Sequence, residues 1–77
     1  MNDLVEFLAR ALVDEPDAVS VEEFEEDDGT VVYEVTVADD DVGKIIGRSG
    51  RTVNALRTVV RAAAVRDGQR VLVDIVD

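Results

Sequence analysis

The sequence predicts an α+β fold with the element order α-β-β-α-α-β, in which three helices pack on one face of a three-stranded mixed sheet. Three observations predict it. Apolar residues recur with helical spacing in three segments, they alternate in three others, and turn residues separate the segments. The 77 residues are enough for one small domain, residues 1–77, and the apolar content of 47% argues against a disordered tail.

The first segment, residues 3–13, is expected to form a helix. Its apolar side chains recur every three or four residues, as they do on one face of a helix, and Phe7 is expected in the core. Asn2 or Asp3 can cap the start of this helix, and Pro16 lies just past its end. The stripe consists of Leu4, Phe7, Leu8, Ala11 and Leu12.

A β-hairpin is expected next. Residues 18–26 form its first strand, and the alternation slips between Val21 and Phe24, so we expect a bulge or a register shift there. The run Asp27-Asp28-Gly29 is a hairpin turn signal, and residues 30–38 then alternate cleanly as a second strand. The apolar face of this second strand carries Val31, Tyr33, Val35 and Val37.

The second half is expected to hold two helices and a final strand. Asp39-Asp40-Asp41 begins a short helix that ends at Ile46, because these acids suit a helix N-terminus. A longer helix covers about residues 50–66, and residues 70–76 form the last strand. Two helices connect the second strand to the third, so these strands are expected to be parallel neighbours. The inner residues are Val42, Ile45 and Ile46 in the short helix, and Val53, Leu56, Val59, Val60 and Ala63 in the long one.

Charge is distributed unevenly along the chain. The net charge is −10, yet residues 1–42 carry fifteen acids and one base, whereas residues 43–77 carry seven bases and three acids. Because salt screens charges beyond roughly 8 Å, local potential decides phosphate binding more than total charge does. The acidic half is interpreted as a solvated, solubilising face, and the alternative is a surface for a basic partner.

The composition excludes several classes of function. The chain has no histidine and no cysteine, so a disulfide framework and a thiolate metal site are impossible. Ser49 has no base beside it in sequence, the aspartate runs lack the spacing of a calcium loop, and residues 47–50 lack the ending of a P-loop. No apolar run approaches the ~18 residues of a membrane span. We therefore expect a cytoplasmic protein that is not an enzyme, with no metal, no cofactor, no small-molecule substrate and no membrane contact.

The most informative segment is Gly43-Lys44-Ile45-Ile46-Gly47-Arg48-Ser49-Gly50-Arg51-Thr52-Val53. It reads as a helix end, a tight Gly-x-x-Gly turn and the start of a second helix. The two glycines let the backbone turn sharply, and the amides that open the second helix lie at the positive end of its dipole, so the turn can hold a phosphate. Arg48 is expected at the tip of this turn. The alternative interpretation of the whole segment is an ordinary helix-turn-helix corner without a phosphate site. Lys44 and Arg51 flank the turn, and Ile45, Ile46 and Val53 are expected to line a groove for bases. The alternative for the pair Ile45 and Ile46 is that at least one of them belongs to the core.

The longer pattern Ile-Ile-Gly-x-x-Gly-x-x-Val resembles the signature of the KH domain, whose Gly-x-x-Gly loop clamps about four nucleotides by their backbone. The element order resembles the type II KH fold over essentially the whole chain. Within that class, residues 43–52, Ala55-Leu56-Arg57 and Ala62-Ala63-Ala64 are similar to the small bacterial KH-domain RNA-binding proteins of the KhpA family.

This resemblance implies a cytoplasmic protein that binds single-stranded RNA as a post-transcriptional regulator or RNA chaperone, linked to cell shape, cell division and cell wall organization. It also implies a homodimer, or a heterodimer with a larger KH protein of the Jag/KhpB type. Pairing of this kind, through the exposed strand or the Ala-rich third helix, is the alternative function. Carried over to this chain, the clamp is Gly47, Arg48, Ser49 and Gly50, with Lys44 and Arg51 as phosphate contacts. Apart from the resemblance, Arg57 and Arg61 lie four residues apart on the long helix and can bind phosphates further along the strand. An ordinary solvated helix face is an equally good interpretation of Arg57.

Overall fold

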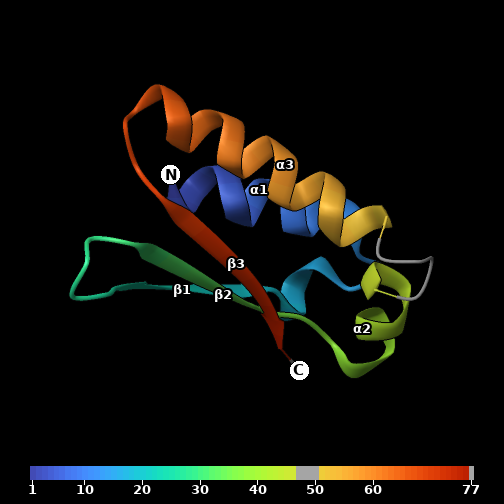
Figure 1. Ribbon diagram of the computed structural model, residues 1–77. Coiled ribbons are helices and arrows are strands. Elements are labelled where there is room, and N and C mark those ends of the chain that lie inside the picture. The colour runs from blue at the N-terminus through green and yellow to red at the C-terminus, as the bar shows by residue number, and fades with distance from the viewer. Residues whose placement is uncertain (47–50, 77) are drawn as a thin grey trace.

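The computed structural model describes residues 1–46 and 51–76. The elements are α1 (Asn2–Leu12), the 3-10 helix η1 (Pro16–Ala18), β1 (Ser20–Glu25), β2 (Val31–Thr36), α2 (Asp39–Ile46), α3 (Arg51–Arg66) and β3 (Val71–Val76). Helices α1 and α3 lie side by side over one face of the sheet, and α2 lies beside the first turns of α3 (Figure 1). The predicted class, order and one-sided helix packing are confirmed, whereas η1 was not predicted.

The sheet has the order β1-β2-β3, with β1 antiparallel and β3 parallel to the central strand β2. The parallel pairing of β2 with β3 confirms the prediction from the two-helix connection. The predicted bulge in β1 is wrong, because β1 pairs with β2 residue for residue from Ser20 opposite Thr36 to Glu25 opposite Val31. Phe24 breaks the alternation because it lies opposite Val32, on the face of the sheet that α1 and α3 leave uncovered.

The core lies between the sheet and the pair α1 and α3. In α1 the buried residues are Val5 and Ala9, whereas Phe7 is 69% exposed, so the prediction of Phe7 in the core is wrong. Leu8 is the residue of the predicted stripe that packs against the core. Apolar side chains cover more than half of the circumference of α1, and the face that packs against the sheet and α3 is the one that carries Val5 and Ala9. The predicted side-chain cap is also wrong, since Met1 precedes the helix without a capping hydrogen bond. The core consists of Val5, Ala9, Val19, Val31, Tyr33, Val35, Val37, Ile45, Val53, Leu56, Val60, Ala64, Val71 and Val73.

Helix α3 presents a different face from the predicted one at two positions. Val59 is 46% exposed, and Ala64 takes the buried position expected for Ala63. The helix ends where Gly68 adopts a positive φ of 70°, a conformation that costs glycine little. The amides of Gly68 and Gln69 then donate to the carbonyls of Val65 (3.1 Å) and Ala64 (2.9 Å), which turns the chain directly into β3.

Tyr33 predicts a pH dependence of stability. It is 2% exposed, and this burial, together with the nearby Glu23 carboxylate, raises the pKa of its phenol above the ordinary 10.0. The folded state thus favours the neutral phenol. The contribution of the buried neutral phenol to the free energy of unfolding is fully present below about pH 10. It is lost as the pH rises through the pKa of Tyr33 in the folded state. We expect the free energy of unfolding to fall less steeply above pH 10 in Tyr33→Phe than in the parent. Urea titrations at a series of pH values above 10 measure this free energy for both proteins. An equally steep fall in Tyr33→Phe and in the parent would contradict the expectation.

Candidate nucleic-acid interface

The predicted clamp residues Gly47, Arg48, Ser49 and Gly50 lie outside the described residues. What the structure places is the frame on either side of them: α2 ends at Ile46 and α3 begins at Arg51. These two helices contact one another, so the segment joins two helices that pack together. The ends of α2 and α3 agree with the two predicted helices, and the tight turn and the roles of the four clamp residues stay predictions.

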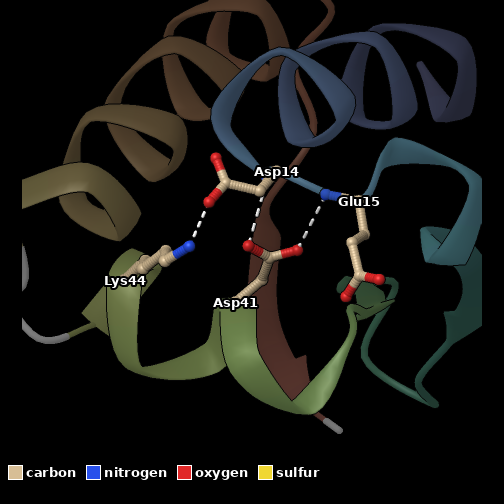
Figure 2. A network of polar contacts seen from close by, with 4 residues as sticks. All are labelled: Asp14, Glu15, Asp41 and Lys44. Atoms are coloured by element: carbon tan, nitrogen blue, oxygen red, sulfur yellow. Dashed lines mark hydrogen bonds and ion pairs between the residues drawn. The ribbon is translucent and has the colours of Figure 1, made fainter.

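Lys44, predicted as a phosphate contact, is exposed near the end of α2. Its ammonium donates to the Asp14 carboxylate, which comes from the segment just after α1 (Figure 2). This hydrogen bond and the charge of Asp14, with smaller contributions from Asp41 and Asp40, raise the pKa of Lys44 above its ordinary value. Lys44 is therefore a cation at neutral pH, and a phosphate at this position would compete with Asp14 for it.

Asp41 is a residue that sequence reasoning missed. It was predicted only as one of three acids at a helix N-terminus, but it is fully buried. Its two carboxylate oxygens accept hydrogen bonds from the amides of Asp14 (3.0 Å) and Glu15 (3.1 Å) (Figure 2). Asp41 thus fastens α2 to the segment after α1. One signal could have found it, because Asp41 lies one helical turn before Ile45 and so shares the buried face of α2.

The predicted groove residues divide into two groups. Ile45 is 0% exposed and Val53 is 5% exposed, so both belong to the core and offer little surface to a base. Each packs its helix onto the rest of the fold. Ile46 and Arg51 are the last residue of α2 and the first residue of α3, and the roles predicted for their side chains stay predictions.

Arg57 lies on α3, one turn after Val53, and is half-buried. Its Nε donates to the carbonyl oxygen of Val73 on β3 at 3.1 Å. This carbonyl lies on the free edge of the sheet. In the parallel pair, β2 forms its hydrogen bonds with the residues of β3 on either side of Val73, so the backbone groups of Val73 point away from β2. Arg57 therefore joins α3 to the sheet edge, and neither an ordinary solvated helix face nor a free phosphate contact describes it completely. Its guanidinium has further N–H groups that can donate to a ligand.

The fold, together with a Gly-x-x-Gly segment between α2 and α3, defines a type II KH domain. Residues 2–75 match the family described as KhpA/KhpB, KH domain, and the chain belongs to this family. The family is not an enzymatic one. Within residues 1–46 and 51–76, no group of three or more acidic side chains is arranged so that it could hold a metal ion. None of the helices described there has the length and the apolar character of a membrane span.

Three relatives illustrate the similarity, and each is called RNA-binding protein KhpA. The protein of Halalkalibacterium halodurans is 53% identical over 78 residues, which span 100% of both chains. That of Caldanaerobacter subterraneus subsp. tengcongensis is 46% identical over 99% of this chain and 100% of its own. That of Chlamydia trachomatis serovar D is 39% identical over 100% of this chain and 97% of its own. The comparison with solved structures gives no match.

Proposed function

We propose that residues 1–77 act as one KH domain that binds single-stranded RNA in the cytoplasm, as a post-transcriptional regulator or RNA chaperone. The observation that carries this proposal is the position of the Gly-x-x-Gly segment between two helices of a type II KH fold. Its relatives are called RNA-binding proteins, which supports the same function.

In this proposal, residues 47–50 hold the RNA backbone. Lys44 and Arg51 supply flanking positive charge, and Arg57 contacts the strand further along α3. Bases lie over the surface between α3 and the edge of β3, with Val53 as part of its support. All these cations belong to the basic half of the chain, and that half carries a net positive charge although the whole chain is acidic.

Salt and strand form test the proposal. Neutralising two or three phosphates gives a slope of log K against log salt of roughly −1.4 to −2.1 for a single strand. A duplex is expected to bind more weakly than a single strand of the same sequence, because paired bases cannot splay into a narrow groove. Fluorescence anisotropy with both forms across a salt series measures both quantities. A preference for duplex, or a slope several-fold steeper, would mean that a broad basic surface binds RNA instead.

A second candidate function is pairing with another KH chain, either a second copy or a larger KhpB-type protein. An exposed apolar surface favours it. Leu8, Ala11, Leu12, Ala55, Leu56 and Val59 line a hollow of about 130 Å³ between α1 and α3. Leu12 and Val59 are 40% and 46% exposed there, and burying such surface on a partner is favourable. Sedimentation equilibrium tests self-pairing, which a chain that stays monomeric at high concentration would contradict.

A further inference from the structure

The sheet has a second face, here called the outer face, which neither α1 nor α3 covers (Figure 1). On β2 and β3, the residues that alternate with the buried ones point to it, and the strand register assigns the residues of β1 opposite them to the same face. The strand register places them in three rows of three, each row crossing the sheet. The apolar row is Phe24, Val32 and Leu72, the acidic row is Glu22, Glu34 and Asp74, and the third row is Ser20, Thr36 and Val76.

Two of these rows are unfavourable in an isolated domain. Phe24 and Leu72 leave 47% and 44% of their surface exposed to water. In the acidic row, three carboxylates stand directly opposite one another on neighbouring strands, and like charges in this position repel. The ion pairs formed among the described residues lie elsewhere: one is within α1, one joins α2 to the segment after α1, and one joins the hairpin turn to Arg70 before β3. The acidic row therefore weakens the pairing of the strands, and the apolar row leaves part of Phe24 and Leu72 in contact with water.

We propose that the outer face binds a segment of another protein that combines apolar with basic side chains. The two rows lie about 7 Å apart, the distance between alternate residues of a strand. A partner segment can therefore cover the apolar row with aliphatic side chains while its lysines or arginines reach the acidic row. Charge complementarity selects this occupant, because the bound cations remove the repulsion among Glu22, Glu34 and Asp74.

The same charges argue against the two other occupants. RNA phosphates would meet three carboxylates and no cation in any of the three rows. A second copy related by a two-fold axis would also be repelled. The acidic row is the middle one of the three, so such pairing centred on the outer face lays one acidic row upon the other.

Four synthetic peptides of equal length test the proposal, with compositions of leucine and lysine, leucine and glutamine, serine and lysine, and leucine and glutamate. The readout is the change in backbone amide shifts of the isotope-labelled full chain. We expect the leucine–lysine peptide to bind at least about tenfold more tightly than the other three and to shift amides of β1, β2 and β3. Equal binding of the serine–lysine peptide, or shifts confined to α1, would overturn the proposal, since either would mean diffuse attraction to an acidic protein.

Variants separate the outer face from the rest of the surface. Phe24→Ser with Leu72→Ser, and separately Glu34→Lys, are each expected to weaken binding of the leucine–lysine peptide about tenfold. Phe7→Ser on α1 and Asp17→Lys in η1 are the matched controls at exposed positions outside the three rows, and neither is expected to change the affinity. Glu34→Lys also relieves the repulsion in the acidic row, so it is expected to melt at a higher temperature than the parent. Changes in the amide shifts of the outer face when RNA is added would instead support RNA as the occupant. The same changes on raising the protein concentration alone would support a second copy of the chain.

Discussion

Replacing Arg48 and Ser49 together with aspartate is expected to abolish binding of short single-stranded RNA while the chain stays folded. The variant removes one cation and adds two carboxylates at the tip of the proposed clamp, where they repel phosphates. A hydrogen bond to a charged group contributes about 1.5 to 3 kcal/mol, so losing two of them lowers the affinity by about a hundredfold or more. Substitutions away from the core usually change stability by no more than about 0.5 kcal/mol. An RNA titration and a thermal melt measure the two effects.

The control for this variant changes charge equally at the far end of α3. Arg66→Asp with Gln69→Asp alters the net charge by the same amount, and both side chains are exposed there. If the clamp binds RNA, this control loses only the small, salt-sensitive part of the affinity that comes from long-range attraction. Equal losses in both variants would mean that overall charge, and not the loop, decides binding. Unchanged RNA affinity in a folded Arg48/Ser49 variant would contradict the proposal that residues 47–50 hold the RNA backbone.

Sedimentation of the same variant shows whether pairing with another chain survives without RNA binding.

The sheet was predictable because one strand carries most of its pattern. β2 alternates cleanly between buried and half-exposed residues, and the two helices between β2 and β3 leave parallel pairing as the expected arrangement. The β1 edge strand was harder, because its glutamates and Phe24 do not follow a simple alternation of apolar and polar residues. That pattern is compatible with a bulge, and only the partner strand shows that the pairing is regular.

The buried face of α1 could not be chosen from the sequence. Apolar residues occupy most of its circumference, so two stripes fit the helical period, one with Phe7 and one with Val5 and Ala9. The choice depends on how the helix packs against the sheet and α3, which is a tertiary property. The smaller residues Val5 and Ala9 are buried, and Phe7, the largest apolar side chain of the helix, is exposed. Periodicity finds a helix more reliably than it finds the side that the helix buries.

The candidate site was predictable where glycines and cations mark it and not where the fold recruits a residue from afar. The segment 43–53 and Arg57 are visible in the sequence, but the contact of Arg57 with β3 is not. Asp41 is hidden within a run of three aspartates, and its partners lie 26 and 27 residues earlier in the chain. Its burial distinguishes it from Asp39 and Asp40, both of which are exposed.

Asp41→Ala is expected to destabilise the fold by about 2 kcal/mol, the largest effect on stability of any single change considered, because it leaves the amides of Asp14 and Glu15 without their acceptor. In a domain of this size, such a loss lowers the melting temperature by about 8 to 16 °C. Asp41→Asn is expected to lose roughly half as much, since its amide oxygen can accept one of the two hydrogen bonds while its NH₂ group faces the other donor. Asp40→Ala is the matched control, one residue away and exposed, and is expected to melt near the parent.

Loss of the Asp41 contact is also expected to weaken RNA binding in the fraction of molecules that remain folded. Asp41 fastens α2, and α2 leads directly into the proposed clamp, so a loosened helix lets the clamp take up more conformations that cannot bind. The required measurement is an RNA titration of Asp41→Asn at a temperature where both this variant and Asp40→Ala are fully folded. A lower affinity in Asp41→Asn alone would assign Asp41 the role of positioning the clamp. Equal affinities at this temperature would restrict Asp41 to stabilising the fold.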